Sequence, residues 1–282
     1  MVNSLLSKHA KSFNWAGFFL SKKIYKKCSI LYDFCRTLDD IADEEVNLKI
    51  KKKKFLEFKT SFEDRDYNNI IIKNIWILLE QEKISSKIIY DLFDGVESDL
   101  MNEIRISNKK DLFVYSYRVA GTVGLMMSKI LKVKNRESHK GAIDLGIAMQ
   151  LTNIARDVIE DKKRNRSYIN HDFMSIQETI KIADSFYDSS FPSIKAIPLG
   201  LRFSIVVARR IYRKIGYNIL KYKNIENYNN AGKVYVSNLS KLVETFLSLF
   251  DLVKLIFTSS NEHLKRNEHL IIGKEIDLNE RI

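Results

Sequence analysis

The sequence predicts an all-α fold, and three observations indicate it. Only 2 prolines and 10 glycines occur among 282 residues, which is too few for the turns of a protein built from sheets. Long stretches rich in Leu, Ile, Lys and Glu follow one another, which favours helices joined by short loops. With 45% of its residues apolar and 29% charged, the chain has enough material for one sizeable core.

The helical pattern begins near residue 17 and continues with short interruptions. These polar segments lie around residues 62–69, 105–110, 134–140, 162–175, 187–199 and 223–231, and none is long enough for a domain linker. Ser107, followed by Asp111, is expected to begin a helix, and residues 141–161 predict another of about five turns. We expect a single domain over residues 1–258 and a polar, flexible tail over residues 259–282.

Residues 241–257 form an amphipathic pattern at the end of that domain. Its apolar side carries Leu242, Phe246, Leu249, Phe250, Val253 and Phe257. A terminal helix that packs this side on the core is the expected structure, and docking to a membrane surface is the alternative.

The chain is basic, with 47 Lys and Arg against 35 Asp and Glu and a net charge of +12. Such a charge attracts nucleic acid, anionic lipid or phosphorylated small molecules. Charge alone does not choose among these partners, because a compositional bias of the genome explains much of the excess equally well.

The cysteines and the amino terminus indicate the compartment. Cys28 and Cys35 are too few for a disulfide framework or a metal site, so a reducing environment fits best. The first 20 residues lack the features of a signal peptide, and no stretch is apolar and long enough to span a membrane. We expect a cytoplasmic protein, either soluble or peripheral to the inner face of a membrane.

Two stripes of polar side chains stand out from otherwise apolar helical segments. The spacing of each stripe, three or four residues at every step, places its members on one helix face. The first stripe consists of Tyr32, Arg36, Asp39 and Asp43. The second consists of Gln150, Asn153, Asp157 and Asp161. Solvated helices carry single pairs of acids by chance, but two extended stripes of this kind are much less probable as accidents.

Paired carboxylates on one helix face predict a bound cation. Two desolvated carboxylates one turn apart repel each other, which raises their pKa values unless a positive charge lies between them. Mg²⁺ prefers carboxylate and amide oxygens and completes its coordination with water and substrate phosphate. Two such helices facing each other would therefore hold Mg²⁺ ions that grip a diphosphate.

A third candidate face lies in the segment YSYRVAGTVGLMM. Tyr117, Gly121 and Gly124 align on one side of the expected helix. Mid-helix glycines allow either close packing of a neighbouring helix or space for a ligand beside the tyrosine hydroxyl.

The motifs HAKSF, RTLDDIAD, YRVAGTVGLMM, LTNIARDVIEDKKRNRSY and ARRIYRKI occur in collinear order over most of the chain. In these motifs the sequence resembles the squalene and phytoene synthase family of head-to-head prenyl transferases. The resemblance implies an isoprenoid-synthase helical fold with a central cavity, and VAGTVGLMM is most similar to bacterial carotenoid enzymes.

The resemblance also implies roles for individual residues. The expected Mg²⁺ ligands are Asp39, Asp43, Asn153 and Asp157, with support from Asp161. Tyr117 is the expected proton acceptor or cation shield. The positions that contact diphosphate or shape the site are His9, Lys11, Ser12, Tyr32, Arg36, Gln150, Arg156, Arg166, Tyr168 and Tyr212. Lys233 departs from the arginine common in relatives, and it would contact phosphate as a point charge.

The implied reaction is the condensation of two geranylgeranyl diphosphates to phytoene, with Mg²⁺ as cofactor, Mn²⁺ as an alternative ion and no use of NADPH. A relative specific for C15 substrates, making dehydrosqualene, squalene or presqualene diphosphate, is the nearest alternative. Non-catalytic assembly factors of the same family need no intact acidic motifs, and both motifs are intact here. A nucleic-acid-binding helical protein agrees with the charge but not with the acidic stripes. The oligomeric state is left open.

Overall fold

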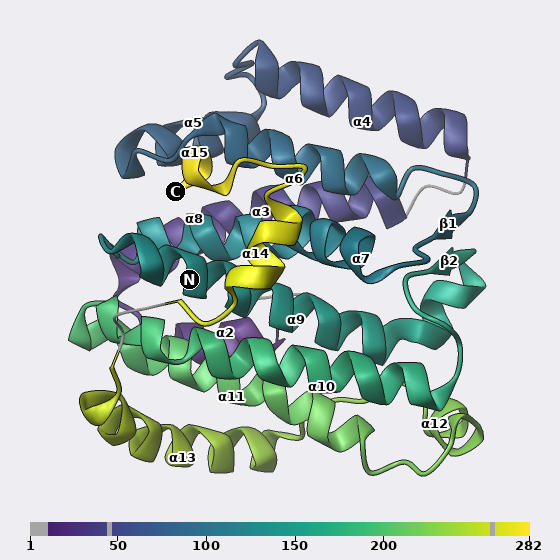
Figure 1. The fold of residues 1–282 in the computed structure, drawn as a ribbon. Coiled ribbons are helices and arrows are strands. Elements are labelled where there is room, and N and C mark those ends of the chain that lie inside the picture. The colour runs from purple at the N-terminus through teal and green to yellow at the C-terminus, as the bar shows by residue number, and fades with distance from the viewer. Residues whose placement is uncertain (1–10, 44–46, 260–262) are drawn as a thin grey trace.

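Helix α9 (Arg136–Lys163) runs through the middle of the molecule and packs against helices on several sides (Figure 1). The computed structural model describes residues 11–43, 47–259 and 263–282. The elements before α9 are α2 (Lys11–Gly17), α3 (Lys22–Asp43), α4 (Leu48–Glu63), α5 (Ile70–Glu82), α6 (Ser86–Ser98), β1 (Ile104–Arg105), α7 (Lys109–Ser116), the π-helical η1 (Tyr117–Gly121) and α8 (Thr122–Ile130). Those after it are β2 (Arg166–Ser167), α10 (Phe173–Ser190), the 3₁₀ turn η2 (Pro192–Ala196), α11 (Leu199–Ile219), α12 (Ile225–Ala231), α13 (Asn238–Phe257), α14 (Arg266–Ile272) and α15 (Leu278–Arg281). The all-α prediction is confirmed.

Polar side chains fix where many of these helices begin. Asn47, Asn69 and Asn135 precede α4, α5 and α9, and each accepts hydrogen bonds from backbone N–H groups of the first turn. Helix α7 is capped in the same way by Asn108, whose side chain accepts a bond of 2.9 Å from the backbone N–H of Asp111. The sequence predicts a start at Ser107, so the cap lies one residue later than predicted.

Glycines let the backbones of η1, α8 and α9 approach closely. A Cβ atom on Gly124 would lie 2.2 Å from the carbonyl oxygen of Ala142, and one on Gly146 would lie 2.2 Å from that of Ala120. Backbone atoms cannot move aside as a flexible side chain could. Close helix packing is therefore the structural reason for Gly124, and the residue also lines the cavity described below.

The two short strands join loops that are distant in sequence. Strands β1 and β2 pair in parallel, with Ile104 opposite Arg166 and Arg105 opposite Ser167. The loop after α9 is thereby held beside the loop after α6, and this fixes the backbone around Arg166.

The C-terminal segment is helical and packed, which differs from the flexible tail expected from its polarity. Figure 1 shows α14 lying across α7. The Asp144 carboxylate of α9 is fully buried and is held at 2.7 Å by the Nε2 atoms of both His263 and His269. Arg281 bonds the buried Asp91 of α6 at 2.9 Å. Polar residues of the tail thus find buried partners on helices far away in the sequence.

Helix α13 also differs from the expectation, because its apolar side faces outward. The six side chains expected in the core, Leu242, Phe246, Leu249, Phe250, Val253 and Phe257, are between 48% and 84% exposed. The inward side instead carries Lys241, Glu244 and Ser248. No helix among the described residues combines the length and hydropathy needed to cross a bilayer.

Candidate active site

The two polar stripes meet at one apolar cavity of about 300 Å³. Tyr32 and Asp39 line it from α3, and Gln150 and Asn153 line it from α9. Most of the remaining wall is apolar. It includes Val119, Val123, Met127, Leu145, Met149 and Ile205. The structure therefore places polar groups of both stripes at a shared hollow with a hydrocarbon-like interior.

A second, more polar cavity of about 580 Å³ lies beside the paired strands. Asp161, the last member of the second stripe, lines it together with Arg166 and Tyr168. The stripe on α9 thus leads from the apolar cavity to this polar one. An apolar cavity beside a polar one suits a ligand with an apolar chain and a charged head.

Basic side chains pair with one acid of each stripe. The Asp43 carboxylate lies 2.7 Å from Arg166 and 2.9 Å from Arg164. The Asp157 carboxylate lies 2.6 Å from its neighbour Arg156 and 3.0 Å from Lys233. These contacts place Arg156, Arg166 and Lys233, the three basic residues expected to contact diphosphate, beside the acidic stripes, together with Arg164.

One acid of each stripe has a raised pKa. Asp39 keeps accessible surface in the cavity but is crowded by protein, so desolvation and the charge of Asp43 raise its pKa to about 7. Desolvation and the charge of Asp157 likewise raise the pKa of Asp161 to about 7. Burial would also raise the pKa of Asp157, but the hydrogen bonds and charges of Arg156 and Lys233 outweigh it and lower that pKa. Each stripe therefore has one carboxylate whose charge is balanced by ion pairs with basic side chains. The other carboxylate of each stripe has a pKa raised by desolvation and by a neighbouring acid.

These residues fit a hard divalent cation. The Oδ1 atom of Asn153 is buried without a hydrogen-bond partner and lies at the cavity between the two stripes. A bound Mg²⁺ would coordinate this oxygen, and its charge would lower the pKa values of Asp39 and Asp161.

The stripe carboxylates do not converge on one point in this structure. Among the described residues, the one group of three acids, histidines or cysteines whose ligand atoms all lie within 4.8 Å of one another is Asp144, His263 and His269. That group is the buried anchor of the tail, and its imidazole Nδ1 atoms lack the hydrogen-bond partners that orient metal-ligating histidines.

Asp99 is a buried acid at this site that the sequence motifs do not indicate. It lies at the end of α6 and accepts hydrogen bonds of 2.8 Å from Tyr115 and 2.7 Å from Tyr168, whose rings stack at 4.7 Å. Burial raises its pKa in spite of these bonds and of the nearby Arg166. Its charge also contributes to the raised pKa values of Asp39 and Asp161, so it belongs to the same electrostatic cluster. The only sequence signal was an acid at the end of a largely apolar helix.

Two tyrosines expected at the site line the apolar cavity. Burial raises the pKa values of Tyr32 and Tyr212 to about 12, so both hydroxyls stay protonated near neutral pH. The Tyr212 ring packs at 4.9 Å on Phe13, another wall residue. Arg36, also expected here, forms an ion pair of 2.5 Å with Asp40 one turn along α3.

Other expected residues lie away from the cavity or outside the described part of the chain. The buried Tyr117 donates a hydrogen bond of 3.1 Å to Asp91, toward the C-terminal segment, and is not among the described residues that line the cavity. This placement does not support its role as proton acceptor or cation shield. His9 lies outside the described residues, and the side chains of Lys11 and Ser12 are likewise not described.

An apolar cavity that is lined by polar stripes from two helices is typical of the class of isoprenoid synthases. A model of the squalene/phytoene synthase family matches residues 6–176, and the chain belongs to this family. The 15-cis-phytoene synthase of Enterobacter agglomerans is 28% identical over 247 residues, which cover 75% of this chain and 82% of that protein. The 15-cis-phytoene synthase of Pantoea ananas is 27% identical over 260 residues, covering 78% and 84% of the two chains.

Solved structures share the fold. A dehydrosqualene synthase in complex with ligand superposes with a TM-score of 0.70 at 23% identity and covers 89% of this chain and 94% of its own. The squalene synthase HpnC from Alicyclobacillus acidocaldarius gives a TM-score of 0.66 at 14% identity, covering 79% and 91%. The isoprenoid-synthase helical fold expected from the sequence is confirmed.

Proposed function

We propose that the protein condenses two geranylgeranyl diphosphates head to head, through prephytoene diphosphate, to phytoene in carotenoid biosynthesis. The observation that carries the proposal is the shared cavity, which Asp39 of α3 and Asn153 of α9 line together. The names of the two bacterial relatives described above, both 15-cis-phytoene synthases, support the choice of phytoene.

The reaction balances without a reductant. The C–O bond of one allylic diphosphate breaks and leaves an allylic cation and diphosphate. A double bond of the second molecule attacks the cation, and loss of a proton gives the cyclopropylcarbinyl diphosphate. This intermediate loses its own diphosphate, rearranges and loses a second proton to give phytoene. NADPH would be needed only for squalene, where a hydride replaces the last proton loss.

The basic residues would stabilise the leaving diphosphate. Arg156, Arg166 and Lys233 can exchange their carboxylate partners for phosphate oxygens, and each arginine can bind two oxygens at once. Mg²⁺, or Mn²⁺ in its place, would be held by Asp39, Asp43, Asn153, Asp157 and Asp161 and would supply positive charge to the diphosphate.

The apolar wall would protect the cations from water. Val123, Leu145 and Ile205 offer no nucleophile, and exclusion of water prevents premature hydrolysis of a carbocation. The rings of Phe13 and Tyr212 can stabilise positive charge through their π faces without reacting.

Product analysis tests the reaction and the chain length. Purified protein is incubated with Mg²⁺ and either C15 or C20 diphosphate, with and without NADPH, and the extracted lipids are separated by chromatography. We expect a C40 product from the C20 substrate that does not depend on NADPH. A C30 product alone would show that the protein is a C15-specific relative. No product from either substrate would instead favour a non-catalytic member of the family.

The acidic stripes are tested by Asp157→Asn. Loss of this carboxylate should lower turnover by roughly 100-fold or more, because it removes an expected Mg²⁺ ligand and a partner of two basic residues. Asp64→Asn, an exposed position at the end of α4, is the matched control and should keep full activity. Near wild-type turnover in Asp157→Asn with an unchanged helical spectrum would contradict the assignment.

A further inference from the structure

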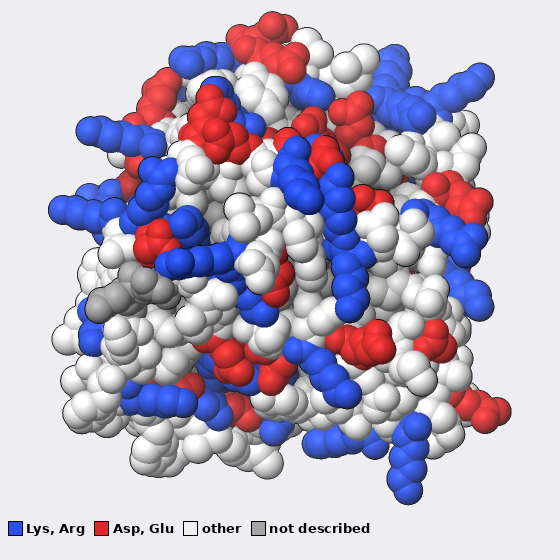
Figure 2. Space-filling view, in the orientation of Figure 1, with Lys and Arg blue, Asp and Glu red and all other residues white. Residues whose placement is uncertain are grey.

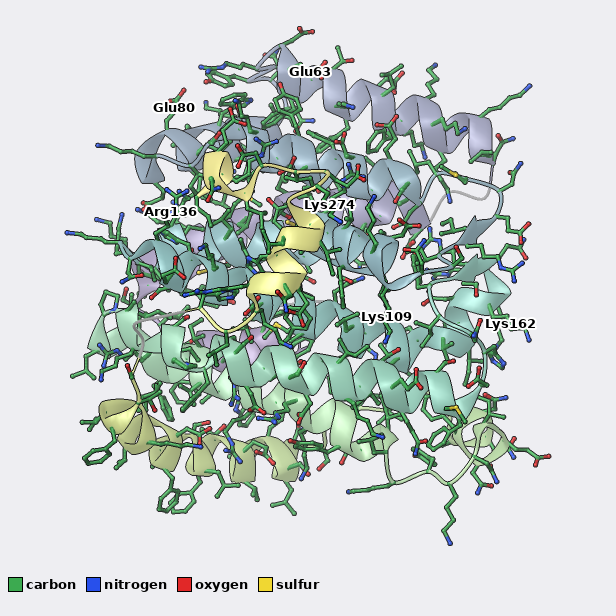
Figure 3. The ribbon with its side chains drawn as sticks, viewed as in Figure 1. Glu63, Glu80, Lys109, Arg136, Lys162 and Lys274 are labelled. Atoms are coloured by element: carbon green, nitrogen blue, oxygen red, sulfur yellow. The ribbon has the colours of Figure 1, made fainter. Side chains whose placement is uncertain are left out.

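Helix α13 presents a continuous apolar surface to solvent. Nine of its large apolar side chains are at least 48% exposed, and Phe257 reaches 84%. They are Leu239, Leu242, Val243, Phe246, Leu249, Phe250, Val253, Ile256 and Phe257. The surface over α13 at the lower left of Figure 2 is largely free of charge, and Figure 3 shows side chains projecting there away from the other helices. Apolar patches larger than a few hundred Å² are unusual on monomers and mark interaction sites.

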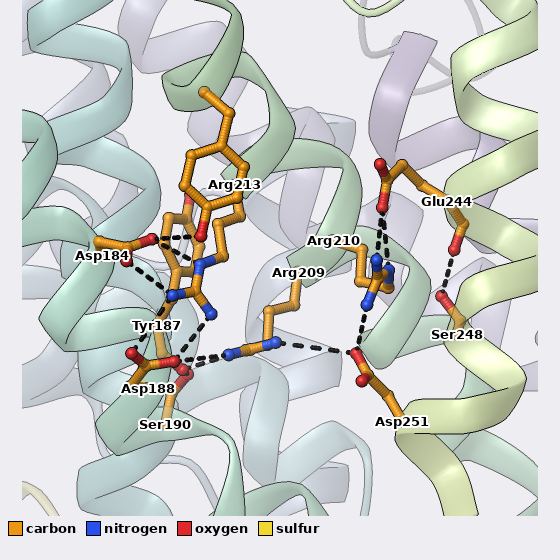
Figure 4. A network of polar contacts seen from close by, with 11 residues as sticks. Asp184, Tyr187, Asp188, Ser190, Arg209, Arg210, Arg213, Glu244, Ser248 and Asp251 are labelled. Atoms are coloured by element: carbon orange, nitrogen blue, oxygen red, sulfur yellow. Dashed lines mark hydrogen bonds and ion pairs between the residues drawn. The ribbon is translucent and has the colours of Figure 1, made fainter. Parts of the chain in front are cut away.

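Ion pairs on the inner side fix this orientation of the helix. Arg210 of α11 lies 2.9 Å from Glu244 and 3.0 Å from Asp251, both on α13 (Figure 4). Lys214 reaches Glu244 at 3.4 Å. Rotation of α13 to bury its phenylalanines would expose Glu244 and break these pairs, and it would leave Arg210 without its partners. These ion pairs therefore hold the apolar side of α13 toward solvent.

A second layer of charge lies beneath the first and holds α11 to α10. Arg209 is almost fully buried and lies 3.4 Å from Asp188 of α10 and 3.9 Å from Asp251 of α13. Arg213 lies 2.7 Å from Asp188 and 2.5 Å from Asp184. Figure 4 shows this network continuing from α10 through α11 to α13. Buried charges are costly to unpair, so the network keeps α13 in register with the body of the protein.

The charges around the exposed surface favour anionic lipid as its partner. Both acids of α13, Glu244 and Asp251, lie on the inner side in ion pairs, and its one exposed charged residue is Lys254. Lys195 of η2 bonds the carbonyl oxygens of Ile256 and Thr258 at the end of the helix. A negatively charged headgroup would meet lysines at this edge and no exposed carboxylate of α13. The net charge of +12 adds long-range attraction to an anionic surface.

The surface also lies close to the apolar cavity. Helix α13 packs on α11 and η2, and these two elements supply Ile194, Ile205 and Ala208 to the cavity wall. Phe18 and Leu199, 73% and 74% exposed, extend the apolar surface at the end of α2 and the start of α11. If the proposed function holds, polyprenyl chains would pass from a bilayer to the cavity over a short path across these elements.

We infer that α13 is an interfacial helix that docks the protein on an anionic lipid bilayer. The helix of 20 residues is about 30 Å long and would lie in the plane of the membrane. Its phenylalanines would enter the acyl region while Lys254 stays among the headgroups. The inference concerns the surface and deepens the proposed function by naming where the substrate is taken up.

Flotation with lipid vesicles tests the inference. The full chain is mixed with vesicles of phosphatidylcholine alone or with about 30% phosphatidylglycerol. We expect binding to the anionic vesicles that weakens as salt rises, and at least about tenfold weaker binding by Phe246→Ser/Phe250→Ser. Leu56→Ser/Ile70→Ser removes two side chains that are 62% and 60% exposed on α4 and α5, and this matched control should bind like the wild type. The helical spectrum of each variant is measured to verify folding, and Phe257→Ser provides a second, single-site test.

Three outcomes would overturn the inference. The first is wild-type protein that stays unbound with anionic vesicles, and the second is phenylalanine variants that bind them as well as the wild type. The third is a wild-type dimer that becomes monomeric in Phe246→Ser/Phe250→Ser and binds no vesicles, which would make a second copy the partner. Turnover of detergent-dispersed substrate separates the two proposals. The phenylalanine variants should keep wild-type turnover there, whereas vesicle binding by a wild type without turnover would refute the proposed function alone.

Discussion

The guanidinium of Arg166 and the carboxylate of Asp43 lie 2.7 Å apart, although 123 residues separate them in the sequence. The pair joins the last residue of α3 to strand β2, and Arg166 also donates to the backbone oxygen of Ala42. Burial would lower the pKa of Arg166, but Tyr168, Asp99 and Asp43 together raise it, so the arginine stays charged. A permanent cation is thus held beside the acidic stripe before any ligand arrives.

Replacement of Arg166 should weaken the stabilisation of the leaving diphosphate. We expect Arg166→Gln to lower kcat/KM by roughly 100-fold, because one charge-assisted, bidentate group for the leaving diphosphate is lost. Arg166→Lys should recover part of the loss, since lysine supplies the charge but a single point of contact. Arg105→Gln is the control, because Arg105 is exposed on the paired strand opposite Ser167. Equal kinetics for Arg166→Gln and the control would contradict the assignment.

The raised pKa values of Asp39 and Asp161 predict that Mg²⁺ stabilises the protein more at high pH. A carboxyl whose pKa rises from 3.8 to about 7 on folding favours the folded state below pH 3.8. It loses that contribution as the pH rises through 7. A cation binds the ionised form and restores the stability there. The rise in Tm on adding Mg²⁺ should therefore be larger at about pH 8 than at about pH 5.5.

Thermal denaturation with and without Mg²⁺ at the two pH values measures this effect. In Asp39→Asn the increment at high pH should shrink, since one ionisable ligand is missing, while Asp64→Asn should behave like the wild type. An increment that is the same at both pH values would argue against these carboxylates as the binding site.

The sequence predicted the parts of the site that follow helical periodicity. Asp39 and Asn153 lie on the faces that their spacing assigned, because a helix fixes side-chain direction from sequence alone. Asp99 was missed because it joins the site through Tyr115 and Tyr168, which lie 16 and 69 residues away. Contacts of this kind depend on tertiary packing, and periodicity carries no information about them.

The two errors of fold have a common cause. Polarity alone predicts that the apolar side of α13 is buried and that the polar tail is flexible. In the structure Arg210 satisfies Glu244 on the inner side of α13, and Asp144 satisfies His263 in the tail. Polar groups that are paired can be buried, so the position of a partner decides whether a polar side chain lies inside the protein or at its surface.

Close packing at Gly124 predicts opposite effects for two glycine substitutions. Gly124→Ala gains helix propensity but places a Cβ 2.2 Å from a backbone oxygen of α9, so we expect destabilisation by about 1–3 kcal/mol. Gly200 near the start of α11 has no atom within 4 Å of the same position, and Gly200→Ala should stabilise by about 0.5–1 kcal/mol. Urea denaturation of both variants measures the two changes. Stabilisation of both would show that η1, α8 and α9 tolerate a wider spacing.

The anchor at Asp144 predicts that the C-terminal helices depend on one buried carboxylate. Its pKa would rise through burial, but the hydrogen bonds of His263 and His269 outweigh this and lower it. The ionised group therefore stabilises the fold above its unfolded pKa of 3.8, and the contribution is lost as the pH falls through the lower folded value.

Asp144→Asn keeps the shape but turns an amide N–H toward one imidazole donor. We expect a loss of about 2–3 kcal/mol in the free energy of unfolding at neutral pH, because a hydrogen bond to a charged acceptor is broken. Faster proteolysis should appear first between α13 and α14, since the tail is the part that loses its buried partner. Urea denaturation and limited proteolysis measure the two effects, with Asp64→Asn as the control. Wild-type stability and an equally protected tail would mean that Ile272, Ile276 and Leu278, which are buried, hold the segment without the carboxylate.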